Sequence, residues 1–267
     1  MTNTVDTRSL IRICHIADIH WRGLSRHDEY KHIFEKLFIE LKRVEPDVIY
    51  VGGDVFHTKT QNISPEIIEL LSWWFRSLAD IAHVVVTLGN HDGNLMNRHR
   101  QDAITPIITL LADDRITLLK RSGTYPSHIT GVNWCVFSCF DEHGWSTVKP
   151  VDGDINIAFF HGAVKGSTTD QGHELRGEVA VEFFDPFDFA LLGDIHKTQF
   201  LAHRTCIDGE VRPWVGYCGS TIQQNYGEAL DHGFLVWDIN SRDDFEVKFV
   251  GIDNPHRFVT LEWHDDL

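Results

Sequence analysis

The sequence predicts an α/β protein, a four-layer α-β-β-α sandwich of two mixed β-sheets. In the first half, apolar runs alternate with amphipathic segments. This strand-helix-strand-helix-strand order is typical of parallel strands joined by right-handed crossovers. After about residue 115, short apolar runs separated by turns predominate and helical spacing is scarce. A single domain of two sheets packed face to face accounts for both sequence patterns.

The first half contains three predicted strands and two predicted helices. The strands are the apolar runs at 11–17, 47–53 and 82–89. Apolar residues at helical spacing predict helices over 25–44 and 64–80. Pro46 lies just past the end of the first helix, and Ser64 with Pro65 forms a typical start for the second.

The second half is predicted to be mostly short strands. These lie at 115–120, 132–138, 155–161, 187–193, 212–220, 233–239 and 245–251. The polar stretch 163–182 lacks any such pattern, so a long surface loop is expected there. We find no internal repeat and no low-complexity segment.

Composition limits the cellular setting and the partners. No apolar run approaches the roughly 18–20 residues of a membrane span, and the N-terminus lacks a signal-peptide pattern. The five cysteines form no CxxC pair, which suits reduced thiols in the cytoplasm. A net charge of −15 argues against broad attraction to nucleic acid, although the basic stretches at 21–26 and 97–101 could contact phosphates.

Five groups of polar residues follow the predicted strands. They are Asp18 with His20, Asp54 with His57, Asn90 with His91 and Asp92, His161 alone, and Asp194 with His196. Each group alone would be read as a turn, a cap or a satisfied polar residue. Because parallel strands bring their carboxyl ends to one edge, the five groups are expected to converge there.

The converged groups would form a metal site. Carboxylate, amide and imidazole ligands without a thiolate suit Mn²⁺, Mg²⁺, Fe or Zn²⁺. Seven potential ligands are too many for one ion and fit two ions about 3.5–4 Å apart. Asp54 is the candidate bridging ligand, and neighbouring glycines such as Gly53 and Gly89 allow close backbone approach.

The order of the motifs resembles the calcineurin-like metallophosphoesterases. DIH, GDVFH, GNHD, a single His and GDIH match that superfamily's pattern DxH, GDxx, GNH(D/E), H and GHxH. The resemblance runs from about Ile11 to about residue 250 and implies the metallophosphoesterase fold. It also implies two divalent metal ions, with Mn²⁺ the first expectation.

A finer resemblance points to the double-strand-break repair nuclease branch, which includes SbcD-type exonuclease subunits and their phage counterparts. Serine/threonine phosphatases carry an Asp-Arg-Gly continuation after the GD motif, where this chain has Phe56-His57 instead, and "YCGSTIQQNYGE" is similar to the tail of the nuclease branch. The implied function is a metal-dependent DNA exonuclease or endonuclease of recombination and repair, using a two-metal-activated hydroxide. The implied partners are DNA, a coiled-coil ATPase subunit of the SbcC type and a second copy in a homodimer.

The resemblance also implies roles for individual residues. It places Asp18, His20 and His196 on one metal, Asn90, His161 and Asp194 on the other, and Asp54 between them. His91 would lie next to the leaving oxygen as general acid, with His57 beside the substrate phosphate. Asp92 would either orient the His91 imidazole or serve only the turn.

Two departures from the family pattern keep alternatives open. Asp194 stands where the family usually has His, and a carboxylate there favours a harder ion such as Mn²⁺ or Mg²⁺. Residues 1–255 would be the nuclease domain, and 256–267 resemble the start of a truncated capping domain. The alternatives are a phosphodiesterase or phosphatase acting on a small phosphate ester, and a non-catalytic scaffold, which only Asp194 supports.

Overall fold

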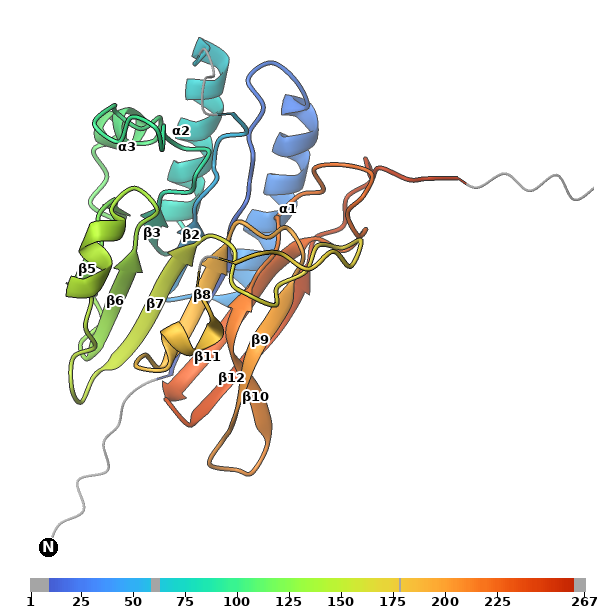
Figure 1. The fold of residues 1–267 in the computed structure, drawn as a ribbon. Helices are drawn as coiled ribbons and strands as arrows, with labels where there is room; N and C mark the ends of the chain where they lie inside the picture. The colour runs from blue at the N-terminus through green and yellow to red at the C-terminus, as the bar shows by residue number, and fades with distance from the viewer. Residues whose placement is uncertain (1–9, 59–62, 178, 262–267) are drawn as a thin grey trace, which may run out of the picture.

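The fold is defined by two six-stranded sheets that pack face to face (Figure 1). The computed structural model describes residues 10–58, 63–177 and 179–261. Residues 1–9, where the sequence shows no signal-peptide pattern, lie outside them, as do residues 262–267 of the expected capping segment. Within the described ranges no helix is both long and apolar enough to cross a membrane.

The first sheet has the strand order β12-β11-β1-β2-β3-β4. Its strands are β1 (Ile11–Ile16), β2 (Val48–Gly52), β3 (His83–Thr87), β4 (Ile116–Leu119), β11 (Gly233–Ser241) and β12 (Asp244–Gly251). β1 to β4 pair in parallel, whereas β11 pairs antiparallel with both β1 and β12. The sheet is therefore mixed, and its parallel part comes from the first half of the chain.

The second sheet has the strand order β5-β6-β7-β8-β10-β9. Its strands are β5 (Gly123–Pro126), β6 (Val132–Phe137), β7 (Ile155–His161), β8 (Phe189–Gly193), β9 (Gln199–Thr205) and β10 (Val211–Tyr217). β6, β7, β8 and β10 are parallel, and the two edge strands are antiparallel to their neighbours. The predicted pair of mixed sheets is confirmed.

Helices α1 (His27–Val44) and α2 (Pro65–Ala79) cover the outer face of the first sheet (Figure 1). Their apolar faces pack on the residues of β1, β2 and β3 that point away from the second sheet. The Ser64 hydroxyl accepts a hydrogen bond from the backbone N–H of Ile67 at 3.3 Å, which caps α2. α1 ends at Glu45, which has a left-handed φ of 54°.

The core between the sheets is rich in aromatic and branched side chains. Strands β1 and β2 bury alternate residues on opposite faces, so Tyr50 points to the second sheet while Ile49 and Val51 point to the helices. The Tyr50 ring stacks on Phe159 of β7 with ring centroids 3.7 Å apart. This contact joins the two sheets directly below their carboxyl ends.

The fourth layer of the predicted sandwich lies outside the second sheet and consists of shorter helices than α1 and α2. In the described part of the chain it is formed by two short 3₁₀ segments, η1 (Glu142–Thr147) and η2 (Val181–Phe184). Trp145 of η1 and Phe184 of η2 pack on Phe160 of β7, with centroid distances of 5.6 and 5.8 Å. Large aromatic rings thus cover this face without a full helix.

The sequence missed α3 (Thr105–Leu111), β5 and β9. α3 is short and fully buries only Ile107, so it shows no helical periodicity. β9 is an edge strand whose residues are all partly exposed or exposed, so apolar alternation is absent. β5 and β9 are strands because they pair antiparallel with β6 and β10.

Candidate metal centre

The ligand candidates lie at the carboxyl ends of strands from both sheets. Asp18 and His20 follow β1, Asp54 follows β2, Asn90 follows β3, His161 ends β7, and Asp194 and His196 follow β8. All five predicted groups therefore meet at one edge, as expected. The first sheet contributes four of the seven predicted ligands, and the second contributes three.

The first predicted ligand set is assembled across the two sheets. One ligand atom each of Asp18, His20 and His196 lies within 4.8 Å of the others. The Nε2 atoms of His20 and His196 are 3.0 Å apart. Two imidazole nitrogens that face the same point can share a cation there.

Asp54 lies between the two predicted sets. Its Oδ2 is 3.6 Å from His20 Nε2, and its Oδ1 is 3.3 Å from His161 Nε2. His161 Nε2 is also 3.7 Å from Asp194 Oδ1, which accepts a hydrogen bond of 2.8 Å from the Asn90 amide. This arrangement matches the bridging position expected for Asp54.

Backbone carbonyls set the tautomers of two imidazoles. His161 Nδ1 lies 2.7 Å from the Gly52 oxygen, and His91 Nδ1 lies 2.6 Å from the His57 oxygen. Because a carbonyl only accepts, both Nδ1 atoms must carry the proton, which leaves Nε2 facing the centre. His161 Nε2 is buried and makes no hydrogen bond to any of the described residues. An orphaned acceptor beside carboxylates fits a bound divalent cation.

Several ligands sit in strained backbone conformations. Asp18, His20, Asp54 and Asp194 have left-handed φ values of 53°, 52°, 52° and 93°. Each such residue costs about 1–3 kcal/mol, and such strain clusters at functional sites. Backbone hydrogen bonds hold the loops, from Asp18 N to Gly53 O at 3.1 Å and from His20 N to Asp54 O at 2.9 Å.

Two glycines permit this packing. Gly53 has a φ of 90°, and a Cβ there would lie 2.6 Å from His161 Nδ1. A Cβ on Gly89 would collide with the Asp54 carboxylate. Side chains at either position would displace the ligands, which explains why both motifs contain glycine.

Burial and charge perturb the acids of the centre in opposite directions. Burial raises the pKa of Asp18 to about 7, although His161 and His196 partly counter it. Burial also acts on Asp54, but the imidazoles of His161 and His20 outweigh it and hold the pKa of Asp54 well below its usual range. A buried cluster of carboxylates with one member poorly compensated by the protein itself is a cation-binding environment.

The two predicted catalytic histidines lie at the rim of the ligand cluster. The His91 side chain is 34% exposed, and its Nε2 is 4.0 Å from Asp54 Oδ2. The ring centroids of His57 and His91 are 5.6 and 5.0 Å from that of His20. Both can therefore reach a group bound at the centre from its open side.

Asp92 serves the turn and does not orient His91. Its two carboxylate oxygens accept hydrogen bonds from the backbone N–H groups of Phe56 and Gly89, at 3.0 and 2.8 Å. The His91 imidazole is oriented by the His57 carbonyl instead. Of the two roles left open by the sequence, the structure supports the turn.

A cleft of about 330 Å³ opens beside the centre. Asp194 and His196 form one side of it, and the other walls come from the polar loop at 169–175 and the turn at 225–228. The loop that the sequence left without structure is thus a wall of the site. The volume suits a small ligand or one nucleotide unit of a polymer.

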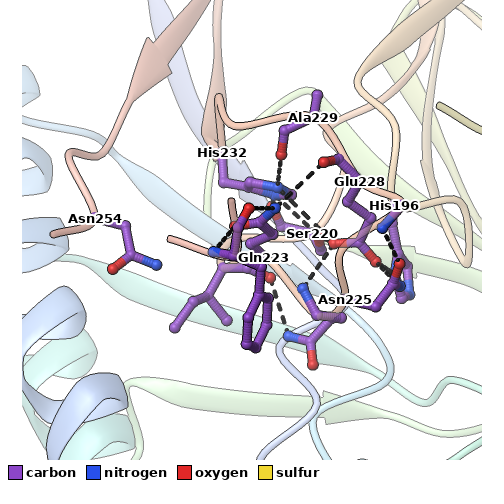
Figure 2. Close-up of polar contacts among 12 residues, drawn as sticks. His196, Ser220, Gln223, Asn225, Glu228, Ala229, His232 and Asn254 are labelled. Carbon is purple, nitrogen blue, oxygen red and sulfur yellow. Dashed lines mark hydrogen bonds and ion pairs between the residues drawn. The ribbon is translucent and has the colours of Figure 1, made fainter. Parts of the chain in front are cut away.

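Sequence reasoning missed one carboxylate at the centre. Glu228, in the loop between β10 and β11, lies 2.7 Å from His196 Nδ1 (Figure 2). It is far from the other motifs in sequence and does not follow a strand end directly. Its only signal was the Gly-Glu pair in the stretch that resembles the tail of the nuclease branch.

Comparisons with known proteins agree with this geometry. The chain is 35% identical over 276 residues to the uncharacterized protein R555 of Acanthamoeba polyphaga mimivirus. It is 22% identical over 290 residues to the DNA double-strand break repair protein Mre11 of Methanopyrus kandleri. Each alignment covers 96% of this chain, which spans 19% and 61% of the two relatives.

A solved structure and a family model complete the comparison. A dimetal phosphatase from Danio rerio shares the fold with a TM-score of 0.50 and 11% identity, over 89% of this chain and 98% of the other. The model of the calcineurin-like phosphoesterases matches residues 11–203, which include all five motifs. The chain therefore belongs to the calcineurin-like phosphoesterase family.

Proposed function

We propose that the chain is a metal-dependent nuclease that hydrolyses phosphodiester bonds in DNA. The observation that carries the proposal is the pair His57 and His91 at the rim of the ligand cluster. His57 belongs to the GDxFH form of the second motif, which resembles the repair nuclease branch. Similarity to a DNA double-strand break repair protein over 96% of the chain supports the same choice.

The ligand set defines what a metal pair would contribute. Asp18, His20 and His196 would hold one ion, Asn90, His161 and Asp194 the other, and Asp54 both. Two divalent ions would supply a water of lowered pKa and neutralise charge on the phosphate oxygens. Carboxylates outnumber the other ligand types on the second ion and its bridge, which favours Mn²⁺ or Mg²⁺.

In its imidazolium form, with a proton on both ring nitrogens, His91 would protonate the leaving sugar oxygen from Nε2. Its Nδ1–H is engaged by the His57 carbonyl, so only Nε2 can exchange a proton with a substrate. A positioned general acid contributes typically about 10²–10⁴-fold to a rate. His57 lies on the same side, where its imidazole would contact a non-bridging phosphate oxygen.

Hydrolysis of a small phosphodiester or phosphomonoester is the second candidate. Two observations favour it: the net charge of −15, which opposes unaided DNA binding, and a cleft of about 330 Å³ beside the centre. Under the nuclease proposal, a separate coiled-coil ATPase subunit and a second copy of the chain would strengthen the grip on DNA.

The test compares polymer and small-molecule hydrolysis. End-labelled single- and double-stranded DNA is incubated with the protein and Mn²⁺, Mg²⁺ or EDTA, with a chromogenic phosphodiester in parallel. Shortening of DNA only with metal supports the nuclease, and the product ladder gives its polarity. Cleavage of the small diester while DNA stays intact, even at low salt, would favour the second candidate.

A further inference from the structure

Glu228 is an acidic residue that contacts the predicted ligand His196 and is not itself among the predicted ligands. Its side chain is only 6% exposed. Its Oε1 accepts a hydrogen bond of 2.7 Å from His196 Nδ1 (Figure 2). It therefore lies behind the His196 ring, on the side opposite His20.

The carboxylate is fixed by donors on both oxygens. Oε1 also accepts from the Asn225 amide at 2.8 Å, and Oε2 accepts from the backbone N–H of Gln224 at 2.7 Å. The Ser220 hydroxyl and the His232 ring lie on the Oε2 side, at 3.5 and 3.9 Å (Figure 2). A buried carboxylate with this many donors has one rotamer available and retains its negative charge.

The loop that carries Glu228 is itself anchored by hydrogen bonds to neighbouring segments. Gln223 Oε1 accepts from the Phe258 N–H at 2.8 Å, and its amide donates to the Phe258 and Glu228 carbonyls at 3.2 and 3.3 Å. The Arg26 guanidinium donates to the Gln223 carbonyl at 2.7 Å. The position of Glu228 is thus set by α1 and by the segment after β12.

We propose that Glu228 is a positioning residue for His196 in the metal centre. By accepting the Nδ1 proton, it fixes the ring orientation and leaves Nε2, 3.0 Å from His20 Nε2, to bind an ion. The inference rests on the proposed ligand role of His196. The chain adds a carboxylate behind one histidine ligand, whereas His161 relies on the Gly52 carbonyl for the same purpose.

The substitution Glu228→Gln tests this role with minimal change of shape. Both carboxylate oxygens face donors, so a glutamine must place its NH₂ group against a donor in either orientation. Groups behind a metal ligand typically contribute about 10–100-fold to metal affinity. We expect one of two Mn²⁺ sites to weaken by roughly that factor in calorimetric titration, with the other site unchanged.

Electron paramagnetic resonance adds a signature that a purely structural role would not produce. With two equivalents of Mn²⁺, at a concentration that fills both wild-type sites, the wild type should show a spin-coupled pair. Glu228→Gln, whose weakened site stays mostly empty there, should show isolated Mn²⁺. Glu246→Gln on β12 makes the same chemical change at an exposed ion pair and should retain the coupled signal.

The outcomes separate the inference from the proposed function. If Glu228→Gln binds Mn²⁺ at both sites with wild-type affinity, the inference is overturned, while the two-metal centre remains supported. Equal weakening of both sites, with a lower unfolding temperature of the metal-free variant, would overturn it in favour of a folding role. If the wild type binds no Mn²⁺, the proposed function fails, and the inference falls with it.

Discussion

Two buried acidic regions of this protein differ in how their charges are compensated. Asp102 lies just before α3, and donors from the protein itself compensate the charge of its carboxylate. Its carboxylate accepts from the backbone N–H groups of Ile104 and Thr105, at 3.1 and 2.7 Å, and from the Thr105 hydroxyl at 2.7 Å. Lys120 completes the set at 2.8 Å. Although burial opposes it, these partners hold the pKa of Asp102 below its usual range.

In the metal centre, donors from the protein compensate the buried charges less completely than at Asp102. Burial raises the pKa of Asp18 to about 7, and within the described part of the chain His161 Nε2 makes no hydrogen bond. Asp18 and Asp54 also lie in left-handed conformations that cost free energy. A buried acid with its own donors contributes to folding, whereas an incompletely compensated cluster is built for a cation from outside. Five predictions test this difference.

The largest effect is expected for Asp54→Asn, which removes the shared charge of the centre. Because Asp54 approaches both ligand sets, phosphodiester hydrolysis should fall by well over ~100-fold, beyond what loss of a group behind a ligand costs. Metal content and initial rates on a chromogenic diester measure this. Asp208→Asn, at an exposed ion pair with Arg212, is the control. Retention of two ions with normal rates would remove Asp54 from the centre.

His91→Ala should separate metal binding from hydrolysis. We expect both ions to remain while the rate falls about 10²–10⁴-fold, as for loss of a general acid. His91 Nε2 is nevertheless only 4.0 Å from Asp54 Oδ2 and belongs to a cluster that could hold an ion. Metal content by mass spectrometry decides between the roles. A parallel loss of metal and activity would make His91 a ligand and not the acid.

Removing the metal should lower the free energy of unfolding only through the loss of ions bound at the metal centre. An ion that binds only the folded state at 100 times its dissociation constant stabilises it by about 2.7 kcal/mol. For a chain of this size we expect Mn²⁺ to raise the unfolding temperature by roughly 5–10 °C over EDTA. Calorimetry of the wild type and Asp54→Asn measures this. An equal rise in the variant would place the stabilising ion elsewhere.

The smallest effect is expected at Asp102. Asp102→Ala should lower the free energy of unfolding by about 1–2 kcal/mol through loss of the helix-start contacts, with hydrolysis unchanged. Asp102→Asn keeps an acceptor for the backbone and should lose less. Urea unfolding measures both variants. Loss of hydrolysis in either would show that Asp102 supports the centre as well as the fold.

The same site has a defined pH dependence. Because the pKa of Asp102 is lower in the folded state, its contribution is present above the unfolded pKa of about 3.9 and is lost as pH falls through the folded pKa. The difference in stability between wild type and Asp102→Asn should therefore close below about pH 4. A constant difference down to pH 3 would show that the charge of Asp102 is irrelevant to folding.

The predictions from the sequence succeeded in regions where a local pattern, such as the alternation of strands and helices, is enough to define the structure. The β-α-β-α-β order fixed the parallel strands of the first sheet, and so the convergence of Asp18, Asp54 and Asn90. The same local patterns do not predict β9, which is an edge strand without apolar alternation. They also do not predict the 3₁₀ helices outside the second sheet, where Trp145 packs against β7. The branch within the family, the metal and the partners stay predictions.

The sequence by itself determined the two mixed sheets and the meeting of the candidate ligands at one sheet edge, because hydrophobic periodicity and the position of polar residues after strands are local properties. Only the tertiary structure decided which groups orient those ligands. The Gly52 carbonyl behind His161, the His57 carbonyl behind His91 and Glu228 behind His196 are brought there by contacts between distant segments. Hydrogen bonds between distant residues depend on atomic placement in the folded chain, which no local pattern encodes.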